Sequence, residues 1–280
     1  MGIEEDDWLR LHCIIHILAF YSSFIIDAKF SRRFDRVHAS PNLCKMNTDN
    51  HWPSREGMVD DAFIPLDWTE VSEDEMNARS EALLDVMRKR RTTRHFSSRA
   101  VPRHLIEKAI LCGGTAPSGA HLQPWTFVAI SSQELKQKIR EAAEAEERKT
   151  YQDRMPDAWR EVLQPLGTDA IKEHLTDAPW VVVLFRQSKR LRPNGEWGPT
   201  YYSSESCGIA AGMFIHAIHN MGLVTLTHTP SPMGFLRDIL NRPDHEHAML
   251  VLPVGYPAED AKIPDLERKL LDEISVFFEA

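Results

Sequence analysis

The chain has 280 residues, of which 42% are hydrophobic and 26% are charged, so it can build one large globular core or two smaller ones. Its formal net charge of −8 disfavours a nucleic-acid partner, which usually binds to a basic surface. The four cysteines form neither a C-x-x-C motif nor a set of close, even spacings, which favours a reducing compartment.

The N-terminal segment, residues 1–37, contains an apolar run over residues 11–26, with an acidic start before it and a basic flank after it. A membrane-spanning helix usually needs ~20 apolar residues, and this run is shorter and includes histidines and serines. No basic segment precedes it, which disfavours a cleaved signal peptide. Two interpretations remain: a short soluble or interfacial helix, or a single membrane anchor whose basic flank keeps the rest of the chain in the cytoplasm.

Residues 38–70 show no periodicity and are rich in Pro, Asn, Asp and Trp, which predicts a tether or an extended arm. The main folded domain is expected over residues 71–280. Ser72 and Glu75 form a capping-box pattern that begins a helix, and this helix runs into the basic segment 88–94. Pro102 is typical of the first turn of a second helix.

A loop rich in glycine and proline, residues 113–125, joins the second helix to a strand predicted over residues 125–130. It contains Ser118, but alanines stand where a nucleophile elbow needs glycines, and the loop does not match a phosphate-binding P-loop. Taken alone, it fits either an ordinary helix-to-strand connection or a rigid loop that presents backbone N–H groups to a ligand.

The rest of the chain mixes helices and strands without strict βαβ alternation, which predicts an α+β sheet with helices on its faces. Ser131 and Glu134 predict the start of a charged helix that runs to about Tyr151. The other expected helices are residues 168–177, 204–221 and 235–240, the expected strands are 180–185, 223–229 and 249–254, and residues 188–200 are expected to be a loop. The tail, residues 264–278, is expected to reach a neighbouring subunit.

The helix predicted over residues 204–221 carries small residues on one face: Ser204, Gly208, Ala211 and Gly212. Small residues let a partner helix approach closely. The face therefore fits either tight packing within one chain or a helix that contacts a second copy. The three histidine pairs of the chain lack a cysteine or carboxylate cluster that would complete a metal site, so no metal is predicted: His12/His16, His216/His219 and His245/His247.

Three groups of polar residues carry side chains whose chemistry suits ligand binding. Arginine pairs bidentately with phosphate, but Arg90, Arg91 and Arg94 also fit a basic helix end. A carboxylate, a phenol and an ammonium group suit an amino acid, but a solvated charged surface can contain the same types: Glu147, Tyr151 and Lys172. The segment 227–229 has hydroxyls that can donate to a ligand ring, although threonine is common in strands.

Taken together, these segments resemble the nitroreductase-fold FMN proteins, and among them the iodotyrosine deiodinase family. The resemblance begins near residue 60 and continues to the C-terminus. It rests on the following segments: 90–96, the loop 114–127, Glu147-x-x-x-Tyr151, Ile171-Lys172-Glu173, Gly222-Leu223-Val224-Thr225, Thr227-His228-Thr229-Pro230, 252–257 and 264–269. Two residues depart from the family pattern: Thr92 stands where serine is usual, and His228 stands where threonine is more usual.

The resemblance implies a nitroreductase-like α+β fold, with a mostly antiparallel or mixed central sheet flanked by helices, in an intertwined homodimer that binds FMN at the subunit interface. It assigns to the FMN phosphate and ribityl chain Arg90, Arg91, Thr92, Arg94 and Arg268, and to the flavin ring Pro117, Ser118, Gly119, Thr227, His228 and Thr229. It assigns to the substrate Ala120, Glu147, Tyr151 and Lys172. The residues implied in catalysis are Thr229, whose hydroxyl donates to flavin N5, and Ala120, whose backbone N–H binds the substrate phenolate.

The implied reaction is reductive dehalogenation of 3-iodotyrosine and 3,5-diiodotyrosine to tyrosine and halide, which salvages iodide. Reduced FMN supplies the electrons. The chain has no G-x-G-x-x-G motif, so a separate NADPH-dependent reductase is expected as the electron donor. One alternative is a general FMN nitroreductase or quinone reductase, which does not need Glu147, Tyr151 and Lys172. Another is a membrane-tethered flavin-binding protein without turnover.

Overall fold

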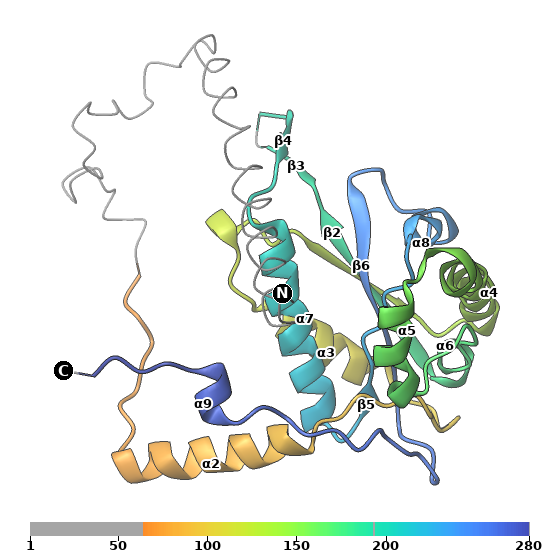
Figure 1. Cartoon of the computed structure of the whole chain (residues 1–280). Helices are drawn as coiled ribbons and strands as arrows, with labels where there is room; N and C mark the ends of the chain where they lie inside the picture. Colours follow the sequence, from red (N-terminus) through yellow and green to blue (C-terminus); the bar gives the residue numbers. More distant parts are fainter. Residues whose placement is uncertain (1–63, 193, 280) are drawn as a thin grey trace, which may run out of the picture. The chain divides into compact units, whose positions relative to one another are not determined.

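The computed structural model describes residues 64–192 and 194–279 (Figure 1). Val71–Ala280 forms one compact unit, and the elements below belong to it. The predicted N-terminal segment, including the apolar run 11–26, and most of the predicted arm lie outside the described residues. Within the described part, no helix combines the length and the apolar character needed to cross a membrane.

The centre of this unit is a four-stranded sheet in the order β1 (Trp125–Ile130), β2 (Trp180–Gln187), β6 (Glu246–Gly255) and β5 (Val224–Thr225), with every neighbouring pair antiparallel. Thr92 adds an isolated parallel bridge to Thr225 at the β5 edge. The expected mostly antiparallel or mixed sheet is therefore confirmed.

Helices cover both faces of the sheet, which explains why β2 is a continuous apolar run and not an alternating one. Val182 faces a core made with α3 (Arg103–Gly114) and α7 (Ser203–Asn220). Val181 and Val183 point to the opposite face, as alternate strand residues must. There they pack against α4 (Gln133–Lys149), α6 (His174–Asp177) and α8 (Gly234–Ile239). The expected sheet with helices on its faces is thus confirmed.

The other described elements lie outside these two layers. They are α2 (Glu73–Lys89), the 3-10 turns Gly119–His121 and Gln164–Leu166, the π-helical turn Thr150–Arg154, α5 (Asp157–Leu163), the hairpin β3 (Lys189–Leu191) and β4 (Trp197–Pro199), and α9 (Leu271–Ile274). In Figure 1, α7 runs beside α3, and its C-terminal end lies near the end of α2. This arrangement brings the basic segment after α2 to the β5 edge of the sheet.

Local capping patterns predicted the starts of α2 and α4 to within one residue. The Ser72 hydroxyl accepts a hydrogen bond from the backbone N–H of Glu75 at 3.3 Å, which begins α2 as predicted. The predicted cap of α4 was one residue early, because Ser132, not Ser131, accepts from the backbone N–H of Leu135. Adjacent serines carry the same capping chemistry, so the pattern alone does not choose between them.

Three predictions made from composition were wrong in extent. The helix expected over residues 168–177 is confined to α6, and α5 forms earlier in the chain. The loop expected over residues 188–200 contains the hairpin β3–β4, which pairs Lys189 with Pro199. The strand expected over residues 223–229 is regular only in β5, after which His228 makes an isolated bridge to Val251.

Candidate active site

Glu147, Lys172 and His228, from three separate segments, meet in one largely buried cluster. Oε2 of Glu147 lies 3.4 Å from Nζ of Lys172, and Oε1 lies 3.5 Å from Nε2 of His228. Glu147 is on the last turn of α4, Lys172 precedes α6, and His228 follows β5. The fold therefore brings together the carboxylate and the ammonium group that the sequence assigned to one substrate.

Lys172 is held in place through both its side chain and its backbone. Its Nζ donates to the carbonyl of Asp169, and its backbone N–H donates to Oε1 of Glu144 at 2.9 Å. Glu144 also accepts from Nε of Arg140 at 2.7 Å. Glu144 was not predicted as a site residue from the sequence, although it lies three residues before Glu147 and so shares its helix face.

Tyr151 lies in the π-helical turn that follows α4. Its hydroxyl donates to Oγ1 of Thr168 at 3.1 Å, and its ring centre lies 5.9 Å from Nζ of Lys172. The backbone N–H of Met155 donates to the carbonyl of Thr150 at 2.9 Å, a five-residue spacing that closes this wider turn. Short π-helical turns recur at functional sites. Glu147 and Tyr151 are therefore near the same lysine, as predicted, although the α-helix ends between them.

The electrostatics of this cluster favour an ionised Glu147 beside two neutral histidines. Burial alone would raise the pKa of Glu147, but His228 and Lys172 outweigh it, and the pKa lies below its usual value. Burial, together with the charges of Lys172 and Arg94, lowers the pKa of His228 although Glu147 opposes the shift. Burial and neighbouring positive charge lower the pKa of His174 to about 3.

His174 was missed by the sequence analysis. Its ring packs edge-on against the ring of His228 with the centres 5.2 Å apart. A histidine next to a predicted ligand-binding lysine is a weak signal, since only the fold shows that it is buried. Arg94 also belongs to these surroundings, because Tyr151 acts on its pKa, which burial lowers.

A second group of cations, the arginine cluster, forms where the tail after β6 returns to the end of α2. Arg268 donates to the carbonyl of Arg88 at 3.0 Å and to that of Arg90, and Arg91 donates to the carbonyl of Pro264. Burial and the charges of Arg268 and Arg91 lower the pKa of Arg90. Guanidinium groups that gather in this way, with no carboxylate on Arg91 or Arg268 within the described residues, fit a phosphate group.

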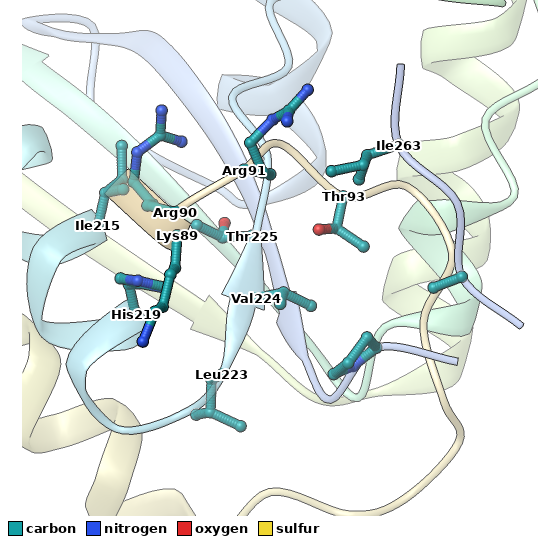
Figure 2. Close-up of a pocket in the computed structure, with 12 residues that line it drawn as sticks. Lys89, Arg90, Arg91, Thr93, Ile215, His219, Leu223, Val224, Thr225 and Ile263 are labelled. Carbon is teal, nitrogen blue, oxygen red and sulfur yellow. The ribbon is translucent and has the colours of Figure 1, made fainter. Parts of the chain in front are cut away.

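A cavity of about 230 Å³ lies next to the arginine cluster, between α2, α7, β5 and the segment after β6. Figure 2 shows that the guanidinium groups of Arg90 and Arg91 point away from Leu223 and Val224, which line the cavity. Ligand pockets are usually larger, about 300–1,000 Å³. Arg90 and Arg91 also line this cavity, so it borders the arginine cluster, although it is smaller than a typical ligand pocket.

In the segment after β5, Thr227 and Thr229 lie on one side of the chain and His228 lies on the other. Thr227 and Thr229 are exposed, whereas His228 is buried, as expected for alternating residues of an extended chain. Thr92 is also exposed, and its neighbour Thr93 donates its backbone N–H to the carbonyl of Thr225 at 3.3 Å. The hydroxyls of Thr227 and Thr229 thus lie on the side opposite the His228 ring.

The loop that follows α3 packs on the N-terminal end of α7. The backbone N–H of Gly119 donates to Oγ of Ser206 at 3.4 Å, and a Cβ added at Gly119 would lie 3.0 Å from the carbonyl oxygen of Tyr201. The Ser118 hydroxyl accepts from the backbone N–H of Gln123 at 2.9 Å. Ala120 adopts a left-handed conformation with φ of 50°, which is uncommon for a residue with a side chain. Such strain concentrates at functional sites.

Within one chain, this loop lies far from the arginine cluster. Gly119 contacts Ser206 near the start of α7, whereas the cavity beside the arginines is lined by Ile215 and His219 near its end. His219 is thirteen positions after Ser206 in the helix, which corresponds to about 20 Å along the helix axis. The fold therefore gathers Glu147, Tyr151 and Lys172, and separately Arg90, Arg91 and Arg268, but it does not bring Pro117–Ala120 to the arginines.

Comparison with known proteins shows which family the chain belongs to. Residues 87–256 match the model of the Nitroreductase family. The chain is 50% identical over 208 residues to an iodotyrosine deiodinase of Haliscomenobacter hydrossis, a match that covers 74% of this chain and 94% of the relative. It is 44% identical over 226 residues to iodotyrosine deiodinase 1 of Mus musculus, which covers 80% of this chain and 79% of the relative.

The fold also resembles a crystal structure of oxidized iodotyrosine deiodinase bound to FMN and 3-iodo-L-tyrosine. That match has a TM-score of 0.61 and 27% sequence identity, and it covers 70% of this chain and 100% of the other. The sequence matches and this structural match agree on the same group of proteins. The chain belongs to the nitroreductase family and, within it, to the iodotyrosine deiodinases.

Proposed function

We propose that this protein catalyses the FMN-dependent reductive dehalogenation of 3-iodotyrosine and 3,5-diiodotyrosine, releasing tyrosine and iodide. The observation that carries the proposal is the meeting of Glu147, Tyr151 and Lys172 in a largely buried site. This chemistry suits the ammonium and carboxylate groups of an amino acid. The similarity to named deiodinases, one of them crystallised with FMN and 3-iodo-L-tyrosine, supports the same conclusion.

The charged cluster provides one partner for each end of a zwitterion. The carboxylate of Glu147 binds the substrate ammonium group, and the Nζ of Lys172 binds the substrate carboxylate. Tyr151 adds a hydroxyl beside that carboxylate. Binding replaces the contact between Glu147 and Lys172 with two contacts to substrate and leaves the total charge of the site unchanged, so no buried charge is left without a partner.

FMN, when bound, supplies the reducing equivalents, and the overall change consumes two electrons and one proton to convert a carbon–iodine bond to carbon–hydrogen and iodide. Arg90, Arg91, Thr92, Arg94 and Arg268 hold the phosphate and ribityl end. The exposed hydroxyl of Thr229 donates to the flavin ring, with Thr227 beside it on the same side of the chain. His228 borders the ring from the segment between these threonines.

The loop that contains Pro117, Ser118, Gly119 and Ala120 completes the site from a second copy of the chain. The loop and the arginine cluster lie at opposite ends of α7, about 20 Å apart, so a single chain does not present both to one flavin. In a two-fold dimer whose axis is perpendicular to α7, the paired α7 helices run antiparallel, and the start of one helix meets the end of the other. The loop of one subunit then faces the arginines of its partner, where the Ala120 N–H binds the substrate phenolate.

The surface of α3 and α7 suits such a dimer contact. A groove of about 790 Å³ between them is lined by Leu111, Gly212 and Met213, among others. Gly208 and Gly212 are exposed, and a Cβ at either position would have no neighbour within 4 Å. Ala211 packs inside the chain, but Gly208 and Gly212 of the small-residue face are open and available to a second copy, which is the second of the two interpretations that the sequence allowed.

Electron supply and location complete the proposal. A separate NADPH-dependent reductase reduces the flavin, because the chain has no dinucleotide-binding motif of its own. Residues 11–26 anchor the protein in a membrane and leave residues 71–280 on the cytoplasmic side. Fractionation of cells that express the full chain, compared with a variant that lacks residues 1–37, tests the anchor: only the full chain should sediment with membranes.

The direct test of the function is iodide release. Purified protein loaded with FMN and reduced with dithionite is mixed with 3-iodotyrosine, and iodide and tyrosine are measured against a sample without protein. We expect stoichiometric iodide and tyrosine. Brisk NADPH-driven reduction of nitroarenes or quinones without iodide release would instead identify a general reductase. A reduced flavin that no halotyrosine reoxidises would identify a flavin-binding protein without turnover.

A further inference from the structure

His228 is a buried imidazole with an unexplained lack of hydrogen bonds. It is 8% exposed, and neither Nδ1 nor Nε2 has a hydrogen-bond partner within the described residues. Buried polar groups are nearly always paired, so each exception needs an explanation. Oε1 of Glu147 lies 3.5 Å from Nε2, slightly beyond an ordinary hydrogen bond.

The two oxygens of Glu147 have different neighbours. Oε1 faces Nε2 of His228, and Oε2 faces Nζ of Lys172 at 3.4 Å. In the proposed function Lys172 turns to the substrate carboxylate, which removes the neighbour of Oε2 and makes it available to the substrate ammonium group. Among the residues that the structure describes, His228 is then the neighbour left to hold Oε1 in place.

We propose that His228 is the positioning residue for Glu147: its Nε2–H donates to Oε1 and directs Oε2 toward the ammonium group of the substrate. This role rests on the proposed function, because it concerns the binding of a zwitterionic amino acid. It assigns the histidine to the substrate side of the site, where its ring lies, in addition to its place in the segment that borders the flavin.

The role requires a neutral imidazole. The charged and titratable groups around His228 are Glu147, Lys172, Arg94 and His174. Two of them are cations, and with burial they keep the imidazole neutral near pH 7. A protonated ring would add a third cation beside Glu147 and oppose the substrate ammonium group. Substrate affinity should therefore fall when the pH drops far enough to protonate His228.

The test compares two side-chain amides that replace different ring nitrogens. Gln places its amide nitrogen near the position of Nε2, and Asn places it near that of Nδ1. We expect His228→Gln to keep the dissociation constant for 3-iodotyrosine within about threefold of the original protein. We expect His228→Asn to raise it roughly tenfold or more, because a hydrogen bond to a charged group is lost. In His228→Asn, FMN affinity should fall much less than the affinity for 3-iodotyrosine.

The pH profile and a double variant separate positioning from a packing defect. The original protein should bind 3-iodotyrosine more weakly once the pH falls below the lowered pKa of His228, whereas His228→Gln should show a flatter profile because its amide does not titrate. In the Glu147→Gln background, His228→Asn should cause little further loss, since the group that it positions is already changed.

Three results would overturn the assignment of His228: equal losses for Gln and Asn, a parallel loss of FMN affinity, or a pH profile that His228→Gln leaves unchanged. In each case iodide release by the original protein would still stand, and so would the proposed function. If the original protein neither binds 3-iodotyrosine nor releases iodide, the proposed function fails, and the role of His228 fails with it.

Discussion

The Nζ of Lys172 lies 3.4 Å from Oε2 of Glu147, and the two side chains are only 8% and 15% exposed. A buried pair of this kind is costly to break by removing one partner, because the remaining charge is left uncompensated. A ligand that provides both an ammonium and a carboxylate group can divide the pair without that cost. A ligand with only one of these groups would leave one charge of the pair without a partner. The pair therefore favours binding of free amino acids, which carry both groups.

The first prediction concerns Glu147→Gln. The substitution keeps the shape but removes the charge that binds the substrate ammonium group. A charge-assisted hydrogen bond contributes about 1.5–3 kcal/mol, so we expect the dissociation constant for 3-iodotyrosine to rise roughly 10- to 100-fold. Titration of the flavin fluorescence with 3-iodotyrosine measures it. Glu141→Gln, at an exposed position of the same helix, is the matched control. A similar loss of FMN affinity would count against the substrate role.

The second prediction concerns Arg268 in the arginine cluster. Arg268→Ala should weaken FMN binding about tenfold or more, because a bidentate contact to phosphate is lost. Arg268→Lys should recover only part of the affinity, since lysine keeps the charge but not the planar fork. Quenching of free FMN fluorescence measures both variants. Arg103→Ala removes an exposed arginine that pairs with Glu107 and should leave FMN binding unchanged. Unchanged binding in Arg268→Ala would contradict the phosphate role.

The third prediction tests whether two chains form each site. Arg90→Ala damages the arginine cluster, and Gly119→Leu damages the loop, because its Cβ would crowd the carbonyl oxygen of Tyr201. Each variant alone should release little iodide. Co-expression with two affinity tags yields a mixed dimer with one intact loop facing one intact arginine cluster, and this mixture should regain up to about half of the activity per dimer.

Size-exclusion chromatography must first show that each single variant still forms a dimer. The doubly tagged mixed dimer is then assayed beside the two single-variant dimers. An inactive mixed dimer would mean that the loop and the arginines serve the same chain, which would contradict the proposed assembly.

The fourth prediction concerns stability and His174. Its pKa lies near 3 in the folded chain, against about 6.5 in the unfolded chain, so the unfolded state binds more protons between these values. Stability should therefore fall as the pH drops below 6.5 toward 3. His174→Leu should lose about 1–2 kcal/mol less between pH 7.5 and 5.5 than the original protein. Urea unfolding at both pH values measures this difference, and identical losses in the two proteins would contradict it.

Several features could be predicted from the sequence because they depend on neighbouring residues. The Ser72 cap of α2, the strand β1 and the helix α7 lie where local chemistry and periodicity placed them, within about a residue or two. The continuous apolar run 180–185 indicated a strand covered on both faces, and β2 has that position in the sheet. The family motifs also grouped Glu147, Tyr151 and Lys172, and the fold places them around one buried contact.

Other features were decided only by the path of the chain. The sequence places His228 between two threonines, but only the fold turns its ring toward Glu147. Glu144 and His174 were missed, because their roles depend on Lys172 and His228, which arrive from distant segments. The loop 117–120 and the arginine cluster were assigned to one flavin, yet the length of α7 separates them within one chain. Sequence patterns report which residues suit a ligand, whereas the distance between them is set by how helices and strands pack.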